Sequence, residues 1–171
     1  CMAIPRGISP AIRNTTFQSI ARYASSIFST PVSTMAAAPD TIYLPPSDRD
    51  LFIEGQTFHL IQRPARDEMH MPVDLFLRHL AEARGEQAGC VILSGTGTDG
   101  THGLRAVKEK SGVAMVQKPE SARHAGMPGS AIETGMVDYV LPPAEMPKRL
   151  IDYYKHPVSL KPVHDKKKST E

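Results

Sequence analysis

A glycine-rich loop with the sequence SGTGTDG, residues 94–100, holds the side chains of this protein that are best suited to chemistry. It carries one carboxylate, Asp99, and the hydroxyl groups of Ser94 and Thr96. A carboxylate in a tight turn can accept a hydrogen bond from an imidazole and orient it, which is the third role in a Ser-His-Asp triad. Such a carboxylate can instead cap the helix that follows. Both roles are compatible with the position of Asp99.

The glycines of this loop also have the spacing of a dinucleotide-binding fingerprint. In that fingerprint the backbone amides approach a pyrophosphate, so the loop should be free of negative charge, yet Asp99 lies inside it. An acidic residue that binds the ribose is expected about 20 positions further on, at the end of the next strand. Glu120 stands at that distance but beyond the apolar run at 113–117. The pattern disfavours a nucleotide site, and we expect no cofactor.

A nucleophile and a base to accompany the carboxylate are not evident. Neither Ser94 nor Thr96 lies in the strained G-x-S-x-G turn that exposes a serine nucleophile, so local turn hydrogen bonds are expected of both. The seven histidines form no metal pattern such as H-E-x-x-H, and His102 is too near the loop carboxylate along the chain for triad geometry. The two cysteines, Cys1 and Cys90, predict neither a disulfide framework nor a metal site.

The elements that must position the loop alternate between helix and strand. Apolar residues at helical spacing predict a helix at 73–84 that ends at Gly85, and the apolar run at 89–94 predicts a strand buried on both faces. Beyond the loop we expect helix, strand, helix, strand and helix in turn, near 104–107, 113–117, 128–134, 137–143 and 144–156. This alternation predicts a doubly wound α/β fold with a mainly parallel sheet and flanking helices. Sites in such folds form outside the carboxyl ends of the strands, where the loop stands.

The first part of the chain predicts a helix at 9–27, a short strand at 41–45 and one antiparallel hairpin at 51–61. With 171 residues, 40% of them hydrophobic and 22% charged, a single soluble domain is expected. A net charge of +2 gives no reason to expect a nucleic-acid partner. No apolar stretch has the length of a membrane span or the pattern of a signal peptide, so we expect a cytoplasmic protein without membrane insertion.

Four segments of the second half form a recognisable series: GTGTDG at 95–100, VQKPESA at 116–122, GMPGSAI at 126–132 and VDYVLPP at 137–143. In their order and spacing they resemble the catalytic domain of the chemotaxis receptor methylesterases, which hydrolyse methyl esters of receptor glutamates. With weaker similarity before these segments, the resemblance covers roughly residues 5–155. The segments DGTHGLRAVK and LPPAEMPKRL are most similar to the form of this domain that is fused to a receptor methyltransferase and sensory domains.

The resemblance implies a Ser-His-Asp hydrolase that demethylates receptor glutamates and deamidates receptor glutamines. Asp99 is similar to the triad aspartate, and the amide near Thr96 corresponds to the region of the oxyanion hole. The strand and turn that carry the family's serine have no counterpart here, and Gly7 stands where the histidine is expected. Because loss of the nucleophile or the base removes most of a triad's acceleration, we expect little or no esterase activity from this chain alone.

We therefore expect a methylesterase-like domain at 1–156 that lacks the first strand and the nucleophile turn, followed by a polar linker or tail at 157–171. Cys1 before Met2 favours a domain without its amino-terminal part. The alternative is a non-catalytic signalling or receptor-binding module of the same fold. The partners that the resemblance implies are the methylated cytoplasmic helices of chemoreceptors and a fused methyltransferase domain. A sheet edge without its first strand would also invite association with another chain.

Overall fold

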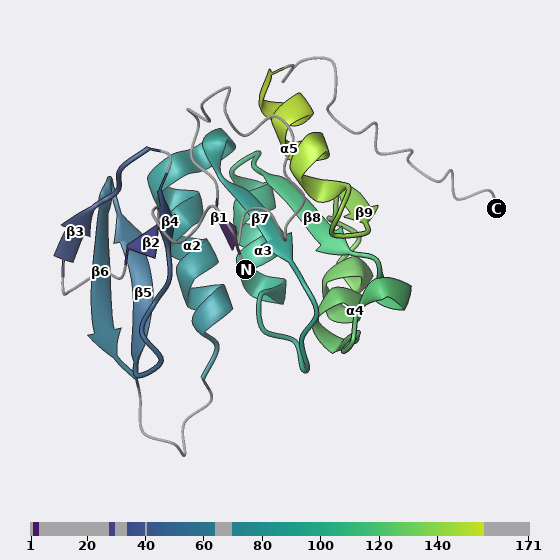
Figure 1. The fold of residues 1–171 in the computed structure, drawn as a ribbon, viewed down its shortest axis with the longest axis horizontal. Helices are drawn as coiled ribbons and strands as arrows, with labels where there is room; N and C mark the ends of the chain where they lie inside the picture. Colours follow the sequence, from purple (N-terminus) through teal and green to yellow (C-terminus); the bar gives the residue numbers. More distant parts are fainter. Residues whose placement is uncertain (1, 4–27, 30–33, 40, 64–69, 156–171) are drawn as a thin grey trace.

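The computed structural model of the chain describes residues 2–3, 28–29, 34–39, 41–63 and 70–155 (Figure 1). The helices in this part are α2 (Pro72–Arg84), α3 (Thr101–Glu109), α4 (Gly126–Glu133) and α5 (Met146–Lys155). The strands are β1 (Met2–Ala3), β2 (Phe28–Ser29), β3 (Thr34–Ala36), β4 (Ile42–Tyr43), β5 (Arg49–Glu54), β6 (Thr57–Gln62), β7 (Gly89–Ile92), β8 (Val113–Gln117) and β9 (Tyr139–Leu141). The helix expected at 9–27 and the tail expected at 157–171 lie outside the described residues.

The main sheet has the strand order β1-β7-β8-β9, and β7, β8 and β9 are parallel. The short strand β1 pairs with β7 in the antiparallel direction. Every residue of β7 and β8 is buried, as expected for strands that are covered on both faces. The predicted α/β fold with a mainly parallel sheet is confirmed.

Alternation along the strands divides the apolar side chains between two clusters. Cys90 and Ile92 lie in a cluster with residues of α2, α3 and α4, whereas the intervening Val91 packs with Met146 and Leu150 of α5. Because successive side chains of a strand point to opposite faces, α5 covers one face of the sheet and the other helices cover the opposite face. The fold is doubly wound, as predicted.

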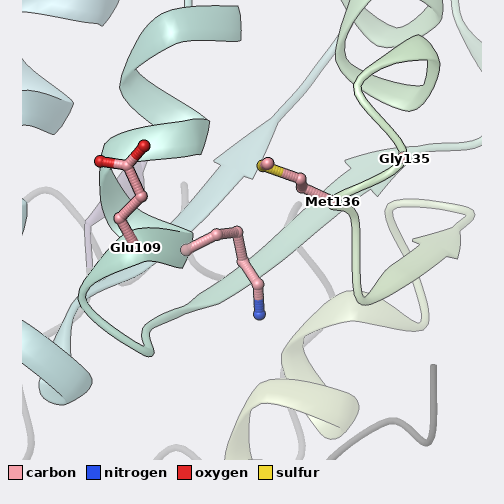
Figure 2. Close-up of a pocket in the computed structure, with 4 residues that line it drawn as sticks. Glu109, Gly135 and Met136 are labelled. Carbon is pink, nitrogen blue, oxygen red and sulfur yellow. The ribbon is translucent and has the colours of Figure 1, made fainter.

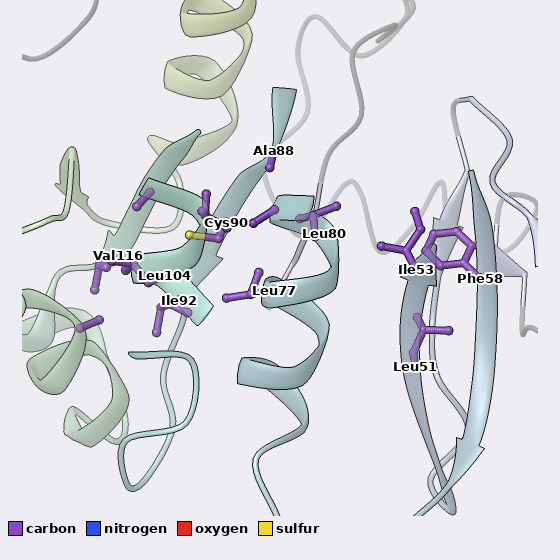
Figure 3. Packing of buried hydrophobic residues seen from close by; sticks show 14 residues of the cluster. Leu51, Ile53, Phe58, Leu77, Leu80, Ala88, Cys90, Ile92, Leu104 and Val116 are labelled. Atoms are coloured by element: carbon purple, nitrogen blue, oxygen red, sulfur yellow. The ribbon is translucent and has the colours of Figure 1, made fainter. Parts of the chain in front are cut away.

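The expected hairpin is also confirmed: β5 and β6 are antiparallel and turn at Gly55, whose φ of 56° is positive. With β3 they form a separate three-stranded sheet beside α2. Figure 3 shows how Leu51, Ile53 and Phe58 of the hairpin continue the apolar cluster that contains Leu77 of α2. Helix α2 therefore joins the hairpin to the main sheet and determines where the residues at its amino end lie.

The buried thiol of Cys90 should make the stability of the fold depend on alkaline pH. Burial, with a smaller effect of the Asp138 carboxylate, raises the pKa of Cys90 from 9.0 to about 12. Below pH 9.0 the thiol is protonated in both states; above it, only the unfolded state ionises, so stability is lost as pH rises towards about 12. Between about pH 8 and about pH 10, the free energy of unfolding, measured with urea, should fall by about 1.4 kcal/mol more for the native sequence than for Cys90→Val. Equal losses in the two proteins would contradict this expectation.

Candidate functional site

The glycine-rich loop at 94–100 follows the carboxyl end of β7, at the edge of the sheet where the sequence predicts a site. Its backbone passes through the left-handed region at Gly97, with a φ of 78°, and at Gly100, with a φ of 94°. Glycine adopts these angles without the steric cost that a side chain would add. The loop can therefore turn sharply between β7 and α3 while Ser94 and Thr96 stay exposed.

Asp99 caps a helix, but not the one that follows it. Its Oδ1 accepts a hydrogen bond from the amide of Asp74 at 2.9 Å, and its Oδ2 accepts one from the amide of Val73 at 3.1 Å. Both donors lie in the first turn of α2, whereas α3 begins at Thr101, after Gly100 at the N-cap position, and has no side-chain cap. The alternative that Asp99 caps the helix after it was therefore wrong, because Asp99 caps α2, which precedes it in the chain. The loop curls back so that the carboxylate meets the free amides and positive dipole end of α2.

Asp74, in the first turn of α2, in turn binds the amino end of α3, a contact that the sequence did not predict. Its side chain is 2% exposed, and its Oδ1 accepts a hydrogen bond from the amide of Gly103 in α3 at 2.7 Å. A Cβ at Gly103 would lie 2.5 Å from Cβ of Leu77, so only glycine allows the two helices to approach this closely. Asp99 and Asp74 thus connect the amino ends of α2 and α3 reciprocally. An acidic residue in the first turn of α2 was the sequence signal for this contact.

The segment at 118–126 is joined to the loop by hydrogen bonds. The amide of Gly95 donates to the carbonyl of His124 at 3.0 Å, and the amide of His124 donates to Oγ of Ser94 at 3.0 Å. Ser94 therefore bonds across the site and not within its own turn, which corrects the prediction of a local bond. For Thr96 the structure gives no side-chain hydrogen bond to another described residue. The segment after β8 forms a wall beside the loop.

Several backbone amides of the loop have no acceptor within the described part of the chain. Within the described part of the chain, the amides of Thr96 and Gly97 donate to no oxygen atom, whereas the amide of Gly95 is already bound to His124. Adjacent free amides in a turn with one left-handed residue can bind an anionic oxygen. Asp99 and Thr96, the two residues that the sequence analysis singled out, thus lie in one loop at the carboxyl edge of the sheet, where the carboxylate of Asp99 is held by two amides.

A second carboxylate, Asp50 on β5, holds an imidazole in an arrangement that the sequence did not reveal. Nε2 of His70 lies 2.8 Å and 2.7 Å from its two oxygens, and Nε of Arg63 lies 3.4 Å from Oδ1. Asp50 is 3% exposed. Because only Met71 separates His70 from the start of α2, this contact ties the hairpin to the helix that Asp99 caps. Asp99 itself bonds to backbone groups, so no triad is assembled among the described residues.

A hollow of about 300 Å³ lies elsewhere, between the end of α3 and the segment that follows α4 (Figure 2). It is lined by Lys108, Glu109, Gly135 and Met136. The Lys108 ammonium is bound to both oxygens of Asp138, each at 2.7 Å, which gives it a structural role. Among the described residues, no three His, Cys, Asp or Glu side chains are placed to hold a metal ion. No helix in the described ranges is long and apolar enough to cross a membrane.

The fold and the site together define a class of protein. It is a doubly wound α/β domain with a glycine-aspartate loop at the carboxyl edge of its sheet. The chain belongs to the CheB methylesterase family, whose model matches residues 6–150. The solved structure of the Thermotoga maritima CheB methylesterase catalytic domain is 33% identical, with a TM-score of 0.65 over 70% of this chain and 66% of that one.

Curated relatives include named protein-glutamate methylesterases and an uncharacterized protein. The protein-glutamate methylesterase/protein-glutamine glutaminase 3 of Paramagnetospirillum magneticum is 31% identical over 156 residues, which are 88% of this chain and 44% of that protein. An uncharacterized 104.1 kDa protein of Rhodobacter capsulatus is 39% identical over 122 residues, which are 71% of this chain and 13% of that protein. The chain spans less than half the length of these two relatives.

Proposed function

We propose that this chain carries the aspartate and oxyanion-binding parts of a protein-glutamate methylesterase and glutamine deamidase. In this proposal Asp99 orients the catalytic imidazole and the amide of Thr96 helps to bind the oxyanion. The observation that supports it most directly is the carboxylate of Asp99, which two backbone amides hold in the same loop as the Thr96 amide, in a chain of the CheB methylesterase family. The Thr96 amide donates to no oxygen of the described residues.

The proposed reaction uses these groups in an acyl transfer. In a complete site, a serine oxygen attacks the ester carbonyl while an imidazole accepts the serine proton, and the carbonyl oxygen becomes an oxyanion near Thr96. Collapse expels methanol, which takes the proton from the imidazolium. Water then hydrolyses the acyl-serine by the same steps and releases a glutamate carboxylate. With a glutamine substrate, the leaving group is ammonia.

Asp99 suits the orienting role because its own position does not depend on the imidazole. The two amide bonds fix the carboxylate and favour its negative charge at the amino end of α2. Each carboxylate oxygen has a further lone pair, so an imidazole N–H can still donate to it. An orienting aspartate keeps the imidazole in the tautomer whose other nitrogen can accept the serine proton.

The proposal places the domain at 1–156, a polar linker at 157–171 and the protein in the cytoplasm. The partners proposed are the methylated cytoplasmic helices of chemoreceptors and a fused methyltransferase domain. The match to 13% of a 104.1 kDa protein supports a domain of this kind within a larger protein. The second candidate is a receptor-binding module without catalysis, which Gly7 at the expected histidine position favours.

Methanol release from a methylated receptor cytoplasmic fragment tests the proposal. The purified chain should bind the fragment but release no more methanol than its Asp99→Asn variant, because the serine turn and the imidazole are absent from the proposed set of residues. Fluorescence anisotropy of the labelled fragment measures the binding. Methanol release that falls sharply in Asp99→Asn would show that a nucleophile and a base are present after all. Absence of binding would contradict the proposed substrate.

A further inference from the structure

Exposed cationic residues lie on the two segments that border the glycine-rich loop. Arg105 projects from α3 just after the loop, and Lys118 and Arg123 lie in the segment after β8. Within the described ranges none of the three takes part in an ion pair, whereas Lys108, Lys110 and Arg63 all do. One exposed carboxylate, Glu120, lies in the same segment. Among the exposed side chains of these two segments beside the loop, positive charge therefore exceeds negative charge, while the carboxylate of Asp99 is half-buried and already bonded to two amides.

The backbone contacts of the site hold these cations beside the loop. Arg123 immediately precedes His124, whose amide and carbonyl are both bonded to the loop. A Cβ at Gly126 would lie 3.0 Å from the amide nitrogen of Gly97, so this segment is in direct contact with the loop backbone. On the other side, the bond from the amide of Gly103 to Asp74 fixes the first turns of α3, which carry Arg105.

The charges favour a particular kind of substrate. A glutamate methyl ester is neutral, so unpaired cations do not attract the reacting group itself. Free carboxylates on the same segment are attracted, and arginine can bind a carboxylate through two parallel hydrogen bonds. Cations gathered at one site also raise the rate of encounter with an anionic partner.

We propose that Arg105, Lys118 and Arg123 form a cationic rim that binds unesterified glutamates next to the glutamate methyl ester of the substrate. This inference rests on the proposed function and adds a specificity to it. The rim selects an ester that stands among free carboxylates over an ester that stands among neutral side chains. The same rim binds the product segment, which carries one more carboxylate, more tightly than the substrate segment.

Two peptides of equal length test the rim, each with one glutamate methyl ester flanked either by glutamates or by glutamines. The dissociation constants, measured by fluorescence anisotropy, should be about tenfold lower for the glutamate-flanked peptide at about 0.1 M salt. Arg105→Gln and Arg123→Gln should each reduce that preference about threefold. At about 1 M salt, where the screening length falls to about 3 Å, the preference should largely disappear.

Lys155→Gln is the matched control, because it removes an exposed cation at the far end of α5. It should leave the preference unchanged. A native chain that binds both peptides equally, or a preference that neither arginine variant reduces, would overturn the rim and leave the proposed function intact. Failure to bind either peptide would overturn both.

Discussion

Replacement of Asp138 by alanine should lower the free energy of unfolding by about 3–5 kcal/mol, the cost of breaking a buried ion pair. The carboxylate is 2% exposed and accepts two hydrogen bonds from the Lys108 ammonium and one, at 2.8 Å, from the amide of Ala114. The Lys108 side chain, only 19% exposed, would lose the counter-charge of its ammonium, and the amide of Ala114 would lose its acceptor. This contact joins the end of α3 to the start of β8 and to the residue before β9.

Urea unfolding followed by circular dichroism measures this loss. Asp138→Asn keeps an oxygen for the amide of Ala114 but lacks the charge, so its loss should be intermediate. The double variant Lys108→Met, Asp138→Leu removes both charges, and its stability should recover much of what Asp138→Ala loses. A loss of less than about 1 kcal/mol in Asp138→Ala would mean that this ion pair contributes no more stability than an exposed ion pair does.

Replacement of Asp99 by alanine should cost about 2–3 kcal/mol of stability before any effect on catalysis. The variant loses two bonds from a charged acceptor to the first turn of α2, and both amides are partly buried. Asp99→Asn keeps one acceptor oxygen, so we expect a loss of about 1 kcal/mol. The same urea titration applies, with Thr98→Ala as a control at an exposed position of the same loop.

An Asp99→Ala protein as stable as Thr98→Ala would contradict this expectation, because it would show that the helix cap contributes no stability in solution. For catalytic tests, Asp99→Asn is the better variant, because it keeps one of the two cap bonds and loses less stability than Asp99→Ala.

Local patterns in the sequence determined most of the elements. The apolar runs at 89–94 and 113–117 became β7 and β8, and the helical spacing at 73–84 became α2, which ends at Gly85 with a φ of 53°. These predictions succeeded because strand and helix periodicities depend on neighbours within one or two turns. The family was also readable, because its motifs are contiguous segments around the loop.

Long-range contacts decided the rest. Asp99 was equally compatible with a triad or a cap, and only the return of the chain brought the first turn of α2, about 25 residues earlier, onto its carboxylate. Ser94 likewise bonds to His124 and not within its turn, and Asp50 of the hairpin meets His70, which lies just before α2. Hydrogen bonds of this kind depend on how helices and strands pack, because a side chain reaches whichever donor the fold places within about 3 Å. The sequence by itself determined the elements and the site loop; the tertiary structure decided which groups each loop side chain contacts.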